Sequence, residues 1–166
     1  MDKKPIDQLT AGDVMHRDLV VVHDRDTLRD AMELMTSNHI TGLPVVNQQG
    51  LCAGVITASD ILNYEQENAD LSGEANEPVG RHFDPETQQW ESVRVSSFAL
   101  EEFGDVQVQS VMSPDVISVA PETPLRDVAA KMRDEQVHRV LVLNPQRWLV
   151  GIISSFDFVR IFADAP

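Results

Sequence analysis

The feature that most constrains the fold of this chain is an internal repeat. Residues 14–62 align without a gap on residues 111–159 when the sequence is shifted by 97 positions. The alignment places Asp60 on Asp157, and many other pairs exchange one apolar residue for another. Chance similarity between two α/β stretches would lose register in the loops, so the alignment indicates that one structural unit is present twice.

Each copy has the pattern of a β-α-β-β-α unit. Short apolar runs bounded by turn residues predict three strands per copy. The expected strands are Leu19–Val22, Leu43–Val46 and Leu51–Ile56 in the first copy, and Val116–Val119, Val140–Leu143 and Leu149–Ile153 in the second. A helix with apolar residues at spacings of three and four follows the first strand of each copy. Asp26 or Thr27 can cap this helix in the first copy, and Thr123 before Pro124 can cap it in the second.

A last helix is expected after Thr57 and after Ser154. In the second copy its apolar face is expected to consist of Phe158, Val159, Ile161 and Phe162. A unit of about 50 residues buries little of its own apolar surface. The sequence therefore predicts an α/β (α+β) chain in which the two repeats pack as a pseudo-twofold pair, with a ligand cleft between them.

The predicted domains are 1–63 for the first repeat, 64–109 for a linker or insertion, and 110–166 for the second repeat. Within the insertion, the alternating run that ends at Val95 predicts a small hairpin or an edge strand. Trp90 is expected to anchor local packing, rather than to stack on a base, because its surroundings are acidic.

Composition excludes several classes of function. The net charge of −14 opposes binding to nucleic acid. The sequence has no apolar run of the length that spans a membrane, so no membrane partner is expected. Cys52 is the only cysteine and lies in an apolar run, which predicts a buried thiol and a cytoplasmic protein.

Four motifs recur in order in both copies. They are Asp13-Val14-Met15 and Ser110-Val111-Met112; Thr27-Leu28-Arg29-Asp30-Ala31 and Pro124-Leu125-Arg126-Asp127-Val128; Thr41-Gly42-Leu43-Pro44-Val45-Val46 and His138-Arg139-Val140-Leu141-Val142-Leu143; and Gly54-Val55-Ile56-Thr57-Ala58-Ser59-Asp60 and Gly151-Ile152-Ile153-Ser154-Ser155-Phe156-Asp157. With these motifs the chain resembles a tandem CBS domain pair, named after cystathionine β-synthase, over residues 13–63 and 110–162.

The resemblance implies a regulatory sensor that binds an adenosine-containing ligand: AMP, ADP, ATP or, in some members, S-adenosylmethionine. It also implies a stand-alone member that forms a homodimer, needs no cofactor and regulates a protein that the sequence does not name. The second copy has His138-Arg139 where the first has the uncharged pair Thr41-Gly42. This difference in charge predicts one competent nucleotide site and one that is weaker or empty.

The last motif suggests how such a ligand would be held. Thr57 and Ser154 stand where a strand turns into a helix, and a hydroxyl with free helix amides can hold a phosphate there. Asp60 and Asp157 follow one helical turn later, and by resemblance they accept hydrogen bonds from a ribose diol. The alternative is simple N-capping, with the aspartates favoured by the helix dipole.

The other candidate site residues differ between the copies. By resemblance, His138 and Arg139 reach ligand phosphates, although Arg139 could instead form a surface ion pair. The first copy has the uncharged pair Thr41-Gly42 at these positions. The residues that could sandwich an adenine are Val20, Ile117, Ser118, Leu43 and Val140. Core packing explains their apolar members equally well.

Two other classes of function remain as alternatives. One is a scaffold for protein interaction or dimerisation whose ligand sites are empty. The other is an enzyme that uses Asp84, Glu86 and His82 of the insertion as acid–base groups. An enzyme is not expected, because the sequence lacks a phosphate-binding Walker loop and a nucleophile elbow, and no histidine has metal-ligand spacing.

Overall fold

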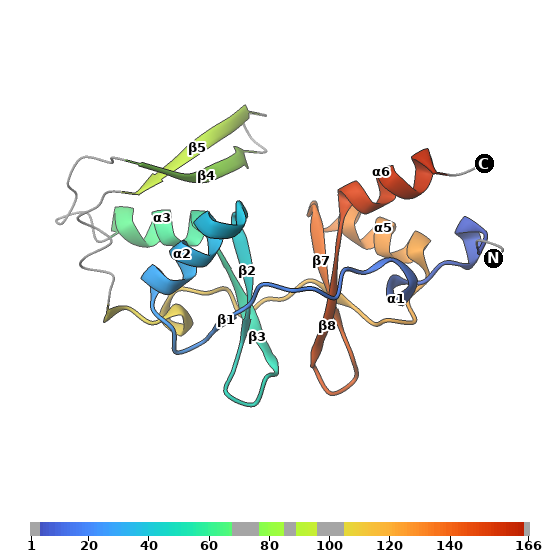
Figure 1. The fold of residues 1–166 in the computed structure, drawn as a ribbon, viewed down its shortest axis with the longest axis horizontal. Helices are drawn as coiled ribbons and strands as arrows, with labels where there is room; N and C mark the ends of the chain where they lie inside the picture. The colour runs from blue at the N-terminus through green and yellow to red at the C-terminus, as the bar shows by residue number, and fades with distance from the viewer. Residues whose placement is uncertain (1–3, 68–76, 85–88, 96–104, 165–166) are drawn as a thin grey trace. The chain divides into compact units, whose positions relative to one another are not determined.

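The chain divides into two units, and each unit contains one copy of the repeat (Figure 1). The computed structural model describes residues 4–67, 77–84, 89–95 and 105–164. Unit 1 consists of Met1–Leu19, Gly50–Cys52 and Val116–Pro166, and unit 2 consists of Val20–Gln49 and Ala53–Asp115. The α/β fold class is confirmed in both units. The pseudo-twofold packing of the pair stays a prediction, because each unit is described by itself.

Unit 2 holds the first copy. Its strands are β1 (Val22–His23), β2 (Gly42–Val46) and β3 (Cys52–Thr57), and its helices are α2 (Leu28–Asn38) and α3 (Ala58–Glu67). The sheet has the order β1-β2-β3, and β1 runs parallel to β2. Thr27 caps α2 by accepting a hydrogen bond from the Asp30 backbone N–H at 3.2 Å, as the sequence predicts. The apolar side chains of α2 at helical spacing are buried against the sheet.

Unit 1 holds the second copy. Its strands are β6 (Ser118–Val119), β7 (Arg139–Leu143) and β8 (Leu149–Ser154), and its helices are α5 (Leu125–Asp134) and α6 (Ser155–Ala163). In the sheet β6-β7-β8, β6 runs parallel to β7, and β8 runs antiparallel to it. Val128 from α5, Val140 and Val142 from β7, and Ile153 from β8 form the centre of its core. The β-α-β-β-α order therefore occurs twice.

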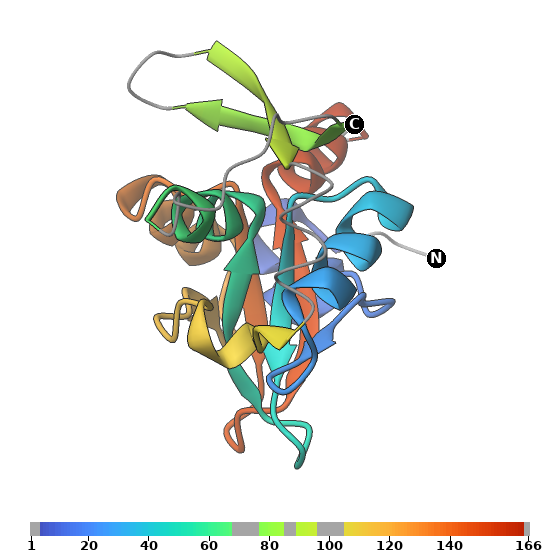
Figure 2. The same cartoon turned by 90° about the vertical axis from the view of Figure 1, so that its left-hand side faces the viewer.

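A two-stranded hairpin follows the first copy. It pairs β4 (Glu77–Asp84) antiparallel with β5 (Gln89–Val95), in the stretch where alternation predicts a hairpin or an edge strand. Both views show it beside α2 and α3 of unit 2 (Figures 1 and 2). The predicted packing role of Trp90 concerns a side chain that lies outside the described residues. Glu86, one of the acid–base candidates, also lies outside them.

The segment that leads into each copy packs on the other copy's strands. Before the first copy come a 3-10 turn (Ile6–Gln8) and the short helix α1 (Ala11–Val14), and both belong to unit 1. Before the second copy comes a 3-10 turn (Val108–Ser110), which belongs to unit 2. His16 forms a β-bridge with Ile152, and Ser113 forms one with Val55. The sequence does not predict this exchange, because the leading motifs adjoin their own copies along the chain.

Two glycines make room for the leading segments. A Cβ atom on Gly151 would lie 2.4 Å from Met15 Sδ, and one on Gly54 would lie 2.4 Å from the Ser113 carbonyl oxygen. Glycine is required at both positions because a side chain would collide with the crossing segment. The last motif of each copy therefore begins with glycine for a packing reason within the unit.

Three local predictions are wrong. The first strand is Val22–His23 and not Leu19–Val22. Thr123 does not cap α5: Pro124 is the N-cap residue, and the Thr123 hydroxyl accepts a hydrogen bond from the Ala120 N–H at 3.1 Å. The Thr123 hydroxyl thus stabilises the turn that precedes the helix.

The third wrong prediction concerns the apolar face of α6. Phe158 and Ile161 are half-buried, but Val159 is 60% exposed and Phe162 is 82% exposed. Phe156, one turn before, is 67% exposed. Helical periodicity divides these residues between two sides of the helix, so only one side packs on the unit.

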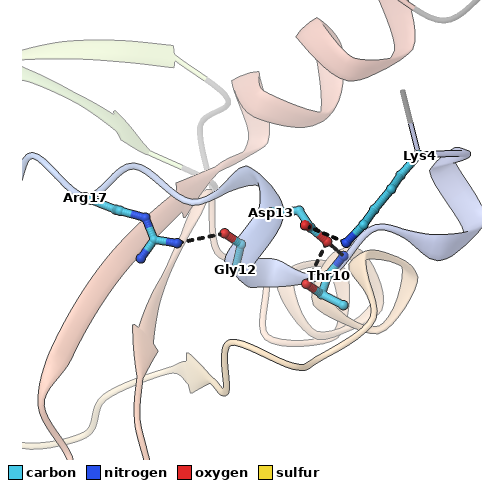
Figure 3. Close-up of polar contacts among 5 residues, drawn as sticks. All are labelled: Lys4, Thr10, Gly12, Asp13 and Arg17. Atoms are coloured by element: carbon cyan, nitrogen blue, oxygen red, sulfur yellow. Dashed lines mark hydrogen bonds and ion pairs between the residues drawn. The ribbon is translucent and has the colours of Figure 1, made fainter. Parts of the chain in front are cut away.

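The start of α1 shows how an S/T-x-x-D pattern works in this chain (Figure 3). The Thr10 N–H and hydroxyl donate to Asp13 Oδ2 at 3.0 and 2.9 Å, and Lys4 Nζ lies 2.9 Å from Asp13 Oδ1. The Lys4 hydrogen bond, followed by those from Thr10, lowers the pKa of Asp13 to about 2. Arg17 donates to the Gly12 carbonyl oxygen at 3.1 Å. The carboxylate thus uses one oxygen to cap the helix and the other to bind a second partner.

Candidate functional site

The Thr57–Asp60 and Ser154–Asp157 pairs both form capping boxes at a strand-to-helix junction. Between β3 and α3, the Thr57 N–H and hydroxyl each donate to Asp60 Oδ2 at 2.7 Å. Between β8 and α6, the Ser154 N–H and hydroxyl each donate to Asp157 Oδ2 at 2.8 Å. The structure therefore shows the N-capping contacts of the alternative interpretation at both junctions.

Capping does not exclude ligand binding, because it uses only one oxygen of each carboxylate. The same box occurs at Thr10–Asp13 and at Thr27–Asp30, again through a single oxygen, Oδ2. The S/T-x-x-D pattern alone thus indicates only a helix start. At Asp60 and Asp157, the second oxygen, Oδ1, is the atom that can accept a hydrogen bond from elsewhere.

The two carboxylates have different surroundings. The Asp157 side chain is 4% exposed, and its Oδ1 lies 2.6 Å from His16 Nε2. Burial would raise the pKa of Asp157, but the hydrogen bonds from the Ser154 N–H, from His16 and from the Ser154 hydroxyl together lower it. Asp60 is half-buried and accepts hydrogen bonds from Thr57. Among the described residues, no second side chain hydrogen-bonds to it.

Sequence reasoning missed His16. The sequence signal that could have identified His16 is its place directly after Met15 of the leading motif, where the other copy has Ser113. However, the motif adjoins the first copy along the chain, and only the exchange of the leading segments brings His16 to the Asp157 of the second copy.

Unit 1 brings its predicted site residues together at one end of its sheet. Arg139, the first residue of β7, is paired in register with Ser154, the last residue of β8. The His138 carbonyl oxygen accepts a hydrogen bond from the Ser155 N–H at 2.9 Å, and both His138 and Arg139 are exposed. The neighbouring strand β6 places Ser118 opposite Leu141.

The predicted adenine-contact residues in unit 1 are not equally available to a ligand. The Ile117 carbonyl oxygen accepts a hydrogen bond from the Leu141 N–H at 3.1 Å, and Ile117 and Ser118 are half-buried. Val140 is 1% exposed and belongs to the core of unit 1, so core packing accounts for this residue.

Unit 2 repeats this arrangement without charge. The Thr41 carbonyl oxygen accepts a hydrogen bond from the Ala58 N–H at 2.9 Å, as His138 does in unit 1. Gly42 lies beside Thr57, where an added Cβ atom would be 3.4 Å from the threonine methyl group. Val20 packs against the core of unit 2, and Leu43 is fully buried in it. Thr41, Gly42, Thr57 and Asp60 thus gather at the end of this sheet.

No three His, Cys, Asp or Glu side chains in the described part of the chain gather so that they could hold a metal ion. None of the described helices is both long and apolar enough to cross a membrane. Two of the acid–base candidates of the enzyme alternative, His82 and Asp84, lie on β4, and their side chains are not among those that the structure describes.

Comparison with known proteins identifies relatives that match most of the chain. CBSX1, a chloroplastic CBS domain-containing protein of Arabidopsis thaliana, is 28% identical over 153 residues, which cover 91% of this chain and 63% of CBSX1. The chain thus spans less than two thirds of that relative's length.

Two solved structures share the fold. A crystal structure of CBSX2 in complex with AMP has a TM-score of 0.65 and 23% identity, and the match covers 93% of this chain and 96% of that one. The CBS domain pair of protein MJ0100, in complex with 5′-methylthioadenosine and S-adenosyl-L-methionine, has a TM-score of 0.64 and 21% identity, over 93% of this chain and 96% of that one.

The family assignment rests on the repeats themselves. The CBS domain family matches residues 11–67 and 108–164, which include both capping boxes at the strand ends and both leading segments. Together these stretches make up more than half of the chain. The chain belongs to the CBS domain family and carries two CBS domains.

Proposed function

We propose that this protein is a regulatory module that binds an adenine nucleotide, AMP, ADP or ATP, with S-adenosylmethionine as a further ligand of the same class. One observation carries the proposal: in each repeat, the helix after the last strand has in its first turn a carboxylate, Asp60 or Asp157, whose Oδ2 accepts the capping bonds and whose Oδ1 can accept a bond from another group. An acceptor at this place suits the two hydroxyl groups of a ribose.

The relatives support an adenosine-containing ligand. The CBSX2 structure contains AMP, and the MJ0100 structure contains 5′-methylthioadenosine and S-adenosyl-L-methionine. These three molecules share adenosine and differ in what is attached at the 5′ position. The shared part fits the proposed role of Asp60 and Asp157, while the 5′ group would be recognised by other residues.

The 5′ phosphate would be recognised mainly in unit 1. His138 and Arg139 are exposed beside Ser154, and a guanidinium binds phosphate oxygens with a planar fork. Unit 2 has Thr41 and Gly42 there. We therefore expect unit 1 to bind nucleotides more tightly than unit 2. In this proposal Ile117 and Ser118 contact the adenine in unit 1, and Val20 contacts it in unit 2.

The chain itself supplies a matched test of this assignment. The double variant His138→Thr with Arg139→Gly gives the second repeat the residues of the first. AMP affinity should fall by about tenfold or more, because a charge-assisted contact to phosphate is lost. Adenosine affinity should stay within about twofold, because adenosine has no phosphate. Isothermal titration calorimetry with both ligands measures the two effects.

Two results would contradict the proposal. If AMP, ADP, ATP and S-adenosylmethionine at millimolar concentration give neither heat nor a thermal shift with the wild-type protein, the nucleotide function is wrong. If the double variant loses adenosine and AMP affinity equally, His138 and Arg139 do not contact the phosphate.

The second candidate function is a scaffold that acts through dimerisation. The observation that favours it is the exposed side of α6, where Phe156, Val159 and Phe162 recur at a spacing of three residues. The aligned residues of α3 are Ser59, Leu62 and Glu65, so the exposed side of α6 is the more apolar of the two. Exposed apolar faces of this kind mark interaction sites.

We propose that this face forms a homodimer, with or without a ligand. The variant Phe156→Ser with Phe162→Ser should convert a dimer into a monomer while the unit stays folded, because both side chains already lie in water in the single chain. Light scattering coupled to size-exclusion chromatography measures the mass. A wild-type protein that is monomeric at about 100 µM, or a variant that remains dimeric, would contradict this interface.

The remaining parts of the proposal follow from the family. CBS domains are generally regulatory modules rather than enzymes. We propose that this chain is not an enzyme, needs no cofactor and acts on a protein partner that is still to be identified. The cytoplasmic location expected from the sequence stays a prediction.

A further inference from the structure

In unit 1, the side chain of His16 contacts the carboxylate of Asp157, and no matching side-chain contact is seen at Asp60 among the described residues of unit 2. His16 Nε2 lies 2.6 Å from Asp157 Oδ1, and the His16 side chain is 48% exposed while that of Asp157 is 4% exposed. The imidazole thus lies on the outer oxygen of a carboxylate that is otherwise buried. Asp157 Oδ2 already accepts two hydrogen bonds from Ser154.

The backbone holds His16 in this place. The His16 N–H donates to the Ile152 carbonyl oxygen at 2.9 Å, and the Ile152 N–H donates to the His16 carbonyl oxygen at 3.0 Å. The preceding Met15 packs directly on Gly151. Because two backbone bonds and a buried contact fix the segment, the imidazole is directed to Asp157 by the fold and not only by its own hydrogen bond to Asp157.

The other repeat provides an internal comparison. Ser113 aligns with His16 and makes the same pair of backbone bonds, to Val55, at 2.9 Å each. Its short hydroxyl side chain makes no recorded contact with Asp60 among the residues described. The leading segment therefore approaches both carboxylates, but only in unit 1 does it bring a group that can carry a positive charge.

We propose that His16 controls access to the unit 1 site: its imidazole is bound to Asp157 Oδ1, and a nucleoside must displace the imidazole to bind there. This inference rests on the proposed function, since it assumes that the ribose uses Asp157 Oδ1. A protonated histidine bonds a carboxylate more strongly than a neutral one does. Acid should therefore strengthen the closed contact and weaken nucleoside binding in unit 1 but not in unit 2.

Other charged groups near His16 do not change this sign. On its own segment, Asp13 is bound by Lys4 and Thr10, and Arg17 is bound to the Gly12 carbonyl oxygen (Figure 3). The other charged or titratable groups on or beside the elements that form this contact are Asp18 on the same segment, His138 and Arg139 just before and at the start of β7, and Arg160 on α6. The cations among them are present in every variant compared below, so differences between variants report His16.

Adenosine is the suitable probe, because a 5′ phosphate itself titrates near pH 6 and would confuse the result. The unit 1 site is measured in an Asp60→Ala background, and the unit 2 site in an Asp157→Ala background. In the first background, adenosine affinity should fall about tenfold from pH 8.5 to pH 5.5, because acid favours the protonated imidazole, which bonds the carboxylate more strongly. Adding His16→Ser should remove the pH dependence and give the higher affinity throughout.

The reverse substitution is the matched control. Ser113→His in the Asp157→Ala background should introduce an acid-dependent loss of adenosine affinity in unit 2, where none exists before. By NMR, saturation with adenosine should also shift the His16 ring resonances of the Asp60→Ala protein, since the imidazole leaves its partner.

The outcomes separate this inference from the proposed function. If adenosine binds with the same pH profile whether residue 16 is His or Ser, or if the His16 resonances do not move at saturation, the inference is overturned and nucleoside binding stands. If neither adenosine nor AMP binds any of these proteins at millimolar concentration, the proposed function fails, and the inference fails with it.

Discussion

Replacing Gly54 with alanine should destabilise the protein by about 3 kcal/mol, which is near the upper end for overpacking in a folded core. The new methyl group would lie 2.4 Å from the Ser113 carbonyl oxygen and 3.1 Å from Met112 Sδ. This oxygen accepts a hydrogen bond from the Val55 N–H, and the Ser113 N–H donates another to the Val55 carbonyl oxygen, so the Ser113 backbone cannot move without breaking the bridge. Thermal unfolding by circular dichroism should show a midpoint about 6–10 °C lower.

Gly151→Ala is the informative comparison. Its methyl group would meet Met15 Sδ, Cγ and Cβ at 2.4, 2.7 and 2.8 Å. These are side-chain atoms, so removing most of them with Met15→Ala should restore part of the lost stability. Met112→Ala should not rescue Gly54→Ala, because the carbonyl oxygen remains.

Gly42→Ala controls for the change of residue type. Its methyl group would lie no closer than 3.4 Å to any neighbour, and we expect a change within about 0.5 kcal/mol. A Gly54→Ala protein as stable as Gly42→Ala would show that the leading segment does not cross the strand as described.

The second large effect is expected at Asp157. Asp157→Ala should cost about 2–3 kcal/mol at pH 7, because it removes three hydrogen bonds to the carboxylate, from the Ser154 N–H, the Ser154 hydroxyl and His16. The two Ser154 bonds are also part of the cap of α6. Asp60→Ala, which removes the same charge and the same kind of cap from a half-buried position, should cost about 1 kcal/mol. Urea unfolding of both variants measures the difference.

The cost at Asp157 should depend on pH with a definite sign. The pKa of Asp157 is lowered in the folded protein, so its ionised form stabilises the fold above the ordinary carboxyl range, and this contribution is lost as the pH falls through the folded pKa. The gap between wild type and Asp157→Ala should therefore narrow when the pH is lowered from 5 towards 3. A gap that stays constant or widens in acid would contradict the account of this carboxylate.

Much of the fold could be predicted from the sequence because the repeat gives each element two independent chances to be recognised. The six strands and four helices of the two copies lie at or near their expected places, since alternation, helical spacing and turn residues agree in both copies. Of the two candidates for the cap of α2, Asp26 and Thr27, the structure shows Thr27 as the cap residue. Thr123 was misassigned because a proline that follows a threonine can itself stand at the N-cap.

The exchange of leading segments could not be predicted, because it is a tertiary contact between parts that local patterns treat separately. Gly54 and Gly151 signal a close approach, but their sequence does not say of what. The partner of Asp157 was missed for the same reason: His16 and Asp157 lie 141 residues apart in the chain. Likewise, apolar residues on both sides of α6 do not reveal which side is buried.

The S/T-x-x-D motif shows where local sequence reasoning ends. Four such boxes form among the described residues, and all four cap a helix through one carboxylate oxygen. What sets two of them apart is their position at the end of a sheet strand, beside the residues of the neighbouring strand. That distinction comes from topology, which the duplication suggests and the structure provides.

The most direct test is to count AMP molecules bound per chain by equilibrium dialysis. The proteins compared are the wild type, Asp60→Ala, Asp157→Ala and the variant that combines Asp60→Ala with Asp157→Ala, and circular dichroism checks that each is folded. We predict that Asp157→Ala abolishes the tighter binding, that Asp60→Ala affects only the weaker binding, and that the folded double variant binds none. If the folded variant with both Asp60→Ala and Asp157→Ala binds AMP with wild-type affinity, these two carboxylates do not bind the ribose.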